Sequence, residues 1–292
     1  MNAERFVDHD AVDWTGVVAA TYRIEQSIRY DYAEPIRDLR HRLMISPRST
    51  HGDQRRVMHE LAVAPDVPSQ LRADKFGNDI LAVAVPYVRE SIAFTLRSTV
   101  LRDSRLGPHL IDRAALQDRV LNGERRLIRV DDALADAATA LRTLYRDPTE
   151  LAEAIVRFVH RTMIYTKKVT DIFTTASVAF RIQRGVCQDY AHVAIALARA
   201  CSLPARYVSG HMLGEGATHA WVEFLVPAGP TTARVLSFDP TTGRATNWRY
   251  LVVAVGRDYE DVAPTSGVFI GNAPGRFDSR QTVRVTGITR AA

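Results

Sequence analysis

The sequence predicts an α+β protein with two parts. An antiparallel β-domain, residues 1–125, precedes a core of helices packed on an antiparallel sheet, residues 126–292. Apolar and polar residues alternate over most of residues 21–102, as in half-buried strands. The apolar period becomes helical after Asp131, and strand-like runs return after Pro204. A chain of 292 residues is long for one domain and comfortable for two.

The N-terminal part contains four β-like runs, some of them broken by proline. The pair Gly77-Asn78 between two of them suits a turn that needs positive φ. We therefore expect an antiparallel sheet or sandwich. Residues 103–128 are charged and contain glycine and asparagine turn signals, so we expect a connector with weak helical character. The expected strands cover residues 21–32, 55–65, 80–88 and 91–101.

The second part opens with two amphipathic helices, expected at residues 131–145 and 148–165. Pro148 suits the first turn of the second helix. Residues 166–185 show no period, and we expect them to be irregular. A third helix is expected from Cys187 to about Cys201, since a proline follows three residues later. Strands are then expected at residues 205–213, 219–226, 233–239 and 250–255.

The composition is that of a globular protein, with 46% hydrophobic and 24% charged residues. The arginines are scattered among Asp and Glu and form no stripe with aromatic residues, so we expect no nucleic-acid partner. No apolar run approaches the ~20 residues of a membrane span. The first 16 residues lack the apolar segment of a secretory signal. We expect a cytoplasmic protein without membrane contact, in which thiols stay reduced.

The chain has only two cysteines, Cys187 and Cys201, at opposite ends of the third expected helix. Their spacing corresponds to ~21 Å along a helix axis, whereas a disulfide needs Cα atoms within ~7 Å. Cys201 lies on the apolar face and is a candidate core residue. Cys187 lies in the first turn, where unpaired N–H groups and the helix dipole stabilise a thiolate. Cys187 is therefore a candidate nucleophile, with a buried structural thiol as the alternative.

A thiolate nucleophile needs a general base, and two of the nine histidines follow Cys187 closely in sequence. His192 lies on the same helix, five residues on, and points away from the first turn, so a structural role is favoured. His219 opens a strand after a loop that contains two glycines. A histidine at such a strand end is free to face a cleft, and we predict His219 as the base.

The base in turn needs an acid that fixes its tautomer. The strands on either side of residues 227–232 form a hairpin whose paired residue numbers sum to about 459. This register sets His219 next to Asp239, at the ~4.5–8 Å of direct or diagonal neighbours. Glu223 is the rival acid, but it lies ~13 Å from His219 along the strand. Asp239 is the predicted partner, with a simple strand-ending turn as the alternative.

A metal centre is not expected from the spacing of the possible ligands. The chain has no short Cys-x-x-Cys or His-x-x-x-His pair, and a site built from the histidines near Cys187 would be scattered. We predict neither a metal nor another cofactor.

The second part contains four blocks in this order: GVCQDYAH, LPARYVSG, THAWVEF and FDPTTG. Taken together, they resemble the transglutaminase-like core of bacterial cysteine enzymes. The segments YDYAEPIRDLRHRLMISPR and DKFGND of the expected β-domain resemble the bacterial N-terminal region that precedes this core in many members. Residues 253–271 resemble the closing segment of the family, and the resemblance spans most of residues 21–272.

The resemblance implies a papain-like fold and a catalytic triad that falls on Cys187, His219 and Asp239. The family often has a Gly-Trp pair shortly before the aspartate, whereas the segment RVLSFDP around Asp239 contains no tryptophan. The family's animal members also use a tryptophan upstream of the cysteine to stabilise an oxyanion, and this chain has none nearby. Tyr165 is therefore a candidate side-chain donor, beside the backbone N–H of Cys187. Trp221 is a candidate for the wall of a substrate cleft.

The predicted chemistry is acyl transfer at a peptide or glutamine amide bond through a thioester. Transfer to water makes the protein a peptidase or amidase, and transfer to an amine makes it a crosslinking transglutaminase. We favour hydrolysis, because nothing in the sequence builds a channel that excludes water and admits a lysine. A non-catalytic binding module is the alternative from another class. The expected partner is a peptide or protein substrate, and the N-terminal domain is a candidate for substrate selection or a homodimer contact.

Overall fold

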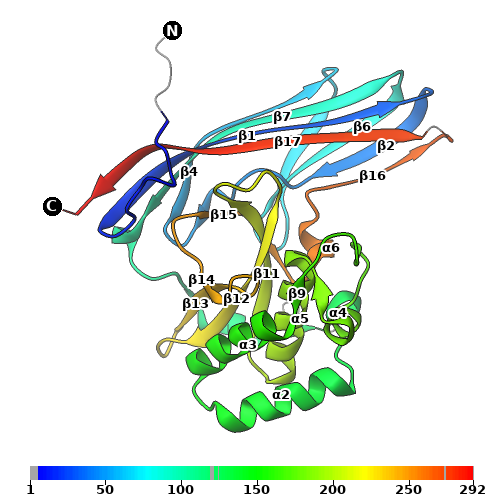
Figure 1. Ribbon diagram of the computed structural model, residues 1–292. Helices are drawn as coiled ribbons and strands as arrows, with labels where there is room; N and C mark the ends of the chain where they lie inside the picture. The colour runs from blue at the N-terminus through cyan, green and yellow to red at the C-terminus, as the bar shows by residue number, and fades with distance from the viewer. Residues whose placement is uncertain (1–5, 119–121, 124, 273, 292) are drawn as a thin grey trace.

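The computed structural model describes residues 6–118, 122, 123, 125–272 and 274–291 (Figure 1). Two long antiparallel sheets form one end of the molecule, and the helices with a third sheet form the other. The fold is α+β, as expected. Part of the predicted connector, residues 119–121 and 124, lies outside the described residues. Among the helices described, none is long and apolar enough to cross a membrane.

The N-terminal sheets pack on each other through one shared hydrophobic core. The first has five strands and the second four, and all their pairings are antiparallel. In order, the first sheet contains β17 (Gly275–Arg290), β1 (Val17–Tyr32), β7 (Ser91–Asp103), β4 (Gln54–Ala64) and β3 (Thr50–His51). The second contains β16 (Thr265–Ile270), β2 (Ile36–Leu43), β6 (Asp79–Val88) and β5 (Ser69–Ala73).

The alternating pattern in β1 explains why it forms a strand. Ile24 and Ile28 are buried in the shared core, whereas Glu25 and Arg29 between and beyond them point to solvent. Successive side chains of a strand point to opposite faces, so the alternation places one face in the core. Gly77 takes φ +74°, which confirms the turn expected before β6.

The core consists of α-helices packed on a third antiparallel sheet. The sheet contains β14 (Arg244–Ala245), β13 (Thr232–Asp239), β12 (His219–Pro227), β11 (Ala205–Met212) and β15 (Tyr250–Gly256), and β8 (Leu110–Asp112) adds to β13. The helices are α2 (Asp132–Leu144), α3 (Pro148–Thr162), α4 (Ala176–Ile182), α5 (Cys187–Ala200) and α6 (Tyr259–Val262). A short parallel pair joins β9 (Ile164–Tyr165) to β10 (Arg184–Gly185). Three 3-10 helices, η1 (Ser104–Leu106), η2 (Arg113–Gln117) and η3 (Arg126–Ile128), lie before α2.

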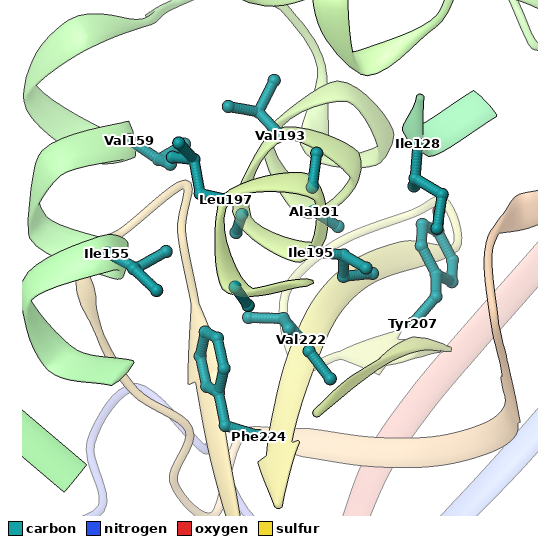
Figure 2. Packing of buried hydrophobic residues seen from close by; sticks show 14 of the residues in the cluster. Ile128, Ile155, Val159, Ala191, Val193, Ile195, Leu197, Tyr207, Val222 and Phe224 are labelled. Carbon is teal, nitrogen blue, oxygen red and sulfur yellow. The ribbon is translucent and has the colours of Figure 1, made fainter. Parts of the chain in front are cut away.

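α5 is the central helix of the core. Every residue from 188 to 198 is buried, so α5 is enclosed on nearly all sides, whereas the sequence suggested a single buried apolar side. Figure 2 shows the side chains of Ile155 and Val159 from α3 and of Val222 and Phe224 from β12 around it. α5 therefore fills the space between the other helices and the sheet, and packing fixes where its first turn lies.

The end of the core differs from the expected boundary. Residues 126–292 were expected in the core, but β16 pairs with β2 and β17 pairs with β1, so residues 265–270 and 275–290 belong to the N-terminal sheets. Conversely, β8 from the expected N-terminal part pairs with β13. Pairing between strands so distant in sequence leaves no mark in the local pattern, and this is why the sequence did not show it.

The segment 166–185, expected to be irregular, contains the helix α4. Thr175 caps its N-terminus by accepting a hydrogen bond from the Val178 N–H, and Gln183 ends it in the left-handed conformation. α4 has only seven residues, which are too few to show a helical period in the sequence. The N-cap residue Thr175 was the sequence signal that could have indicated this helix.

The free edge of β15 is closed by two buried amide side chains from the N-terminal sheets. Gln54 donates to the Val252 carbonyl at 2.8 Å and accepts from the Val252 N–H at 2.9 Å. Asn78 makes the same pair of bonds with Val255, at 2.7 and 2.9 Å. An unpaired strand edge inside a protein is costly, so these amides replace a neighbouring strand and fix the core against the N-terminal sheets.

Replacing Gln54 with alanine removes both partners of Val252 while its N–H and carbonyl stay buried. Since each unsatisfied group costs about 1–3 kcal/mol, we expect the free energy of unfolding to fall by about 2–4 kcal/mol. Chemical denaturation measures this. Gln70, which is exposed in β5, is the matched control, and Gln70→Ala should change stability by less than about 0.5 kcal/mol. Equal midpoints for the two variants would contradict a role of Gln54 in closing the edge.

Candidate active site

Cys187 is the first residue of α5, and the chain just before it is held by Asp189. The Asp189 carboxylate accepts from the Val186 N–H at 2.7 Å and from the Thr170 hydroxyl at 2.7 Å. Gly185 must be glycine, because a Cβ there would overlap the Asp189 side chain. Burial raises the pKa of Asp189. These contacts fix the direction in which the chain enters the helix.

The position of Cys187 in the first turn gives it two properties. Its side chain is half-buried, and it is a free cysteine, as is Cys201. Its backbone N–H belongs to the first turn, where N–H groups have no carbonyl partner within the helix. Cys201 is 5% exposed at the other end of α5, and its thiol donates to the Ala138 carbonyl at 3.3 Å. The two cysteines do not pair, as expected.

His219 lies at the start of β12 between a carboxylate and the thiol. Its Nε2 is 2.9 Å from Oδ2 of Asp239, and Cys187 lies close enough to the ring to raise its pKa. Burial alone lowers the pKa of His219, but the hydrogen bonds to Asp239 and Cys187 and their charges raise it to about 10. The imidazolium form of His219 is therefore favoured at neutral pH.

Asp239 ends β13 and has no solvent exposure. Besides His219, its carboxylate accepts from the Tyr250 hydroxyl at 2.8 Å and from the N–H and hydroxyl of Thr241 at 2.8 and 2.6 Å. Burial alone raises the pKa of a carboxyl, but the bond to His219, the charge of its ring and the hydroxyl donors hold the pKa of Asp239 below its ordinary value. A buried carboxylate with four donors is satisfied and fixed in direction.

The structure brings Cys187, His219 and Asp239 together, by a register slightly different from the expected one. In the hairpin Val222 pairs with Phe238, so the paired numbers sum to 460 instead of about 459. The ladder ends at this pair, before it reaches His219. The contact with Asp239 is made by side chains beyond the last ladder pair.

Tyr250 and Thr241 were not predicted. Thr241 follows an Asp-Pro pair, and a carboxylate that bonds the N–H two residues on is a common turn, so this contact had a sequence signal. Tyr250 begins a separate strand, β15, and nothing local in the sequence connects it with Asp239. Its hydroxyl reaches the carboxylate only because β15 and β13 belong to the same sheet.

Tyr165 lies beside the candidate nucleophile. Tyr165 pairs with Gly185 in the short parallel ladder of β9 and β10. Its ring centroid is 6.2 Å from that of Tyr190 on α5. The side chain is 48% exposed. Burial of the rest of it, together with the nearby charge of Cys187, raises the pKa of Tyr165, so the hydroxyl stays protonated and able to donate.

Trp221 does not form a cleft wall, because it is completely buried. Its ring stacks behind His219 with centroids 6.3 Å apart, and its indole N–H donates to Ser237 at 3.0 Å. Gly210, opposite His219 on β11, leaves room for this ring, since a Cβ there would overlap Trp221 and the Leu251 carbonyl. Trp221 therefore supports the histidine from inside the sheet.

The other histidine and carboxylate weighed from the sequence lie apart from this site. His192 is fully buried and accepts from the Tyr259 N–H at 3.2 Å, and burial lowers its pKa to about 3. Glu223 is bonded to Arg206 at 2.6 Å and to His51 at 2.7 Å, so it is occupied elsewhere. Both observations agree with the structural role that the sequence analysis favoured for His192 and the low rank it gave Glu223.

Other bacterial proteins are similar to this chain in sequence or in structure. Uncharacterized proteins of Mycobacterium tuberculosis are 29% identical over 280 residues, which cover 86% of this chain and 88% of theirs. An uncharacterized protein of Mycobacterium leprae is 27% identical over 287 residues, 90% of this chain and 98% of its own. A crystal structure from Cytophaga hutchinsonii, described as "a Putative Cysteine Protease", has a TM-score of 0.72 at 21% identity and covers 91% of both chains. It shows the same fold.

Two family models match the two parts of the chain. Residues 22–101 match the bacterial transglutaminase-like N-terminal region, which corresponds to most of the two N-terminal sheets. Residues 135–240 match the transglutaminase-like superfamily and contain Cys187, His219 and Asp239. Residues 135–240 therefore form a transglutaminase-like core, and residues 22–101 form the N-terminal region of bacterial transglutaminase-like proteins.

Proposed function

We propose that this protein is a cysteine hydrolase that cleaves peptide or glutamine amide bonds, with Cys187 as nucleophile, His219 as acid and base, and Asp239 as the group that orients His219. The observation that carries the proposal is the position of His219 between a carboxylate and the thiol. Asp239 Oδ2 lies 2.9 Å from His219 Nε2, and Cys187 lies close enough to the same ring to raise its pKa. Nucleophile, base and orienting carboxylate in this order are the arrangement of known acyl-transfer triads.

In the first half-reaction, Cys187, which has already given its proton to His219, attacks the carbonyl carbon of the amide with Sγ. The carbonyl oxygen takes up the electron pair as the S–C bond forms. His219 then protonates the departing nitrogen, the C–N bond breaks, and a thioester remains on Cys187. The raised pKa of His219 suits this step, because the ring must hold a proton to deliver it.

The oxyanion of the tetrahedral intermediate needs donors near Cys187. The Cys187 backbone N–H is one, because it lies in the first turn of α5 without a helical partner. Tyr165 is the second candidate, since it keeps its proton and lies near Cys187. Loss of one such donor typically costs about 10²–10³ in rate, so this role is large enough to measure in Tyr165→Phe.

In the second half-reaction, water attacks the thioester and His219 takes its proton. A carboxylic acid leaves, and the proton returns to the sulfur. We favour water over an amine because nothing in the sequence builds a channel that admits a lysine side chain and excludes water. The description of the Cytophaga hutchinsonii structure as a cysteine protease agrees with this preference.

A polypeptide substrate is supported by the segment that leads to Cys187. Residues 164–182 expose seven large apolar side chains, and this segment joins β10 directly before the nucleophile. Exposed apolar side chains gathered in one segment mark a binding surface. They are Ile164, Tyr165, Val169, Ile172, Phe173, Val178 and Ile182.

The first test is a product assay on a peptide library containing glutamine, with and without a primary amine. We expect cleavage or deamidation, and no amine incorporation, by mass spectrometry. Cys187→Ala should abolish the products and Cys201→Ala should retain them. Because acid–base catalysis contributes roughly 10²–10⁴-fold, Asp239→Ala should lower kcat/KM by about that factor. Amine incorporation as the main product would replace hydrolysis by crosslinking.

The second test measures the reactivity of the thiol. We expect iodoacetamide near neutral pH to label Cys187 selectively, since Cys187 is partly exposed and lies beside the proposed base His219. Cys201 should stay unlabelled in the folded protein, because it is buried and burial raises its pKa. Labelling is mapped by mass spectrometry, and His219→Ala should lose most of it. Equal labelling of both cysteines would favour the non-catalytic binding module.

The third test follows the protonation of His219. Its pKa of about 10 lies above the ordinary value of 6.5, so protonation stabilises the folded state fully below pH 6.5. This contribution is lost as the pH rises from 6.5 through about 10. In Asp239→Asn the carboxylate charge is gone and burial lowers the pKa of His219. We expect the difference in free energy of unfolding between wild type and Asp239→Asn to shrink as the pH rises over this range. A difference constant with pH would contradict the raised pKa.

A further inference from the structure

Three side chains outside the proposed triad meet behind the core sheet. They are His51 of β3, His109 directly before β8, and Glu223 of β12. One ligand atom from each lies within 4.8 Å of the other two. His51 Nε2 is 2.7 Å from Glu223 Oε1, and the two imidazole rings meet edge to face with centroids 4.5 Å apart. His51 and Glu223 are buried, and His109 is half-buried.

We propose that His51, His109 and Glu223 bind a zinc ion. The site would join three separate parts of the chain: the N-terminal sheet through β3, the connector before β8, and the core sheet through β12. Two imidazole nitrogens and one carboxylate oxygen are a donor set that zinc takes in proteins. The proposal is independent of the proposed hydrolase activity.

The distances require only a small rearrangement. Zinc binds imidazole nitrogen and carboxylate oxygen at about 2.0–2.2 Å, which sets tetrahedral ligand atoms about 3.3 Å apart. The hydrogen bond between His51 and Glu223 would open by about 0.6 Å, and His109 would move inward. A cavity of about 440 Å³, lined by His51, His109 and Arg206 among others, lies on this side and can supply water as the fourth ligand.

The surroundings orient the carboxylate and select the kind of ion. Arg206 Nε donates to Oε2 of Glu223 at 2.6 Å and so leaves Oε1 for a metal, as outer hydrogen bonds to metal-binding carboxylates do. Arg48 adds a second positive charge nearby. With one carboxylate facing two guanidinium groups, the site lacks the oxygen ligands and negative charge that calcium and magnesium need.

Gly52 keeps the position of His109 open. It takes φ +56°, and a Cβ there would lie 3.1 Å from the His109 side chain. The glycine beside His51 thus allows both rings to approach Glu223. The sequence analysis expected no metal, because it considered histidines near Cys187, whereas these three ligands lie 58 and 114 residues apart in the chain.

The test uses the full chain carrying Cys187→Ala, so that the thiol and His219 cannot bind zinc themselves. Zinc binding is measured by calorimetry and by metal content after dialysis, and thermal unfolding is followed with and without zinc. We expect one zinc per chain and a higher midpoint of unfolding with zinc. Adding His109→Ala should weaken binding by roughly 100-fold or more, since even outer-shell losses cost 10- to 100-fold.

The matched control is His9→Ala, which removes the histidine of an exposed Asp8-His9-Asp10 cluster. It should leave zinc affinity and the zinc-dependent midpoint unchanged. Glu223→Gln is the second ligand variant, and circular dichroism checks its fold. His109 is only half-buried, so we expect the His109→Ala protein to fold. The proposal is overturned if the Cys187→Ala protein binds no zinc, or if His109→Ala leaves its zinc affinity unchanged. It is also overturned if His9→Ala is the only variant that loses zinc binding.

Discussion

The buried carboxylate of Asp239 is the constraint on which the candidate active site depends. A carboxylate without solvent exposure must have its hydrogen bonds supplied by the protein, and four donors from three residues supply them. One donor is Tyr250, the first residue of β15, and the free edge of β15 is held by Gln54 and Asn78 from the N-terminal sheets. The N-terminal sheets therefore support His219 indirectly, through β15, Tyr250 and Asp239. They contribute to the geometry of the site without contributing a side chain to it.

The histidines of this chain show how neighbours decide the charge of one residue type. His192, His109 and His211 are buried without a carboxylate charge strong enough to offset burial, and their pKa values fall to about 3 or 4. His219 is buried as well, but Asp239 and Cys187 reverse the direction. His51 has a carboxylate partner and still stays neutral, because burial dominates and Arg206 neutralises much of the charge of Glu223. Two carboxylate–imidazole pairs in this protein thus differ in the charge of the ring: the pKa of His219 is raised, whereas that of His51 is lowered.

Much of this arrangement could be predicted from the sequence, and the failures have physical causes. The period of residues 187–201 predicted α5, and its start gave Cys187 its place in the first turn. The hairpin predicted the contact between His219 and Asp239 despite a register error of one, because both residues lie at the open end of the same strand pair. Trp221 was expected at a cleft, but burial depends on what packs above a strand, and Gly210 is what makes the room. Tyr250, the His51 cluster and the return of β17 to β1 all depend on contacts between distant segments, which local patterns do not record.

The place of β17 has a consequence for how the protein is made. β1 pairs on one side with β7 and on the other with β17, the last strand of the chain. During translation residues 17–103 emerge and can pair long before residues 275–290 exist, so β1 has one open edge until β17 has been made. An open edge of that length is a template for pairing with other chains. A nascent or prematurely terminated polypeptide that lacks β17 therefore exposes the edge of β1 and is prone to aggregate, whereas β17 covers this edge in the folded protein.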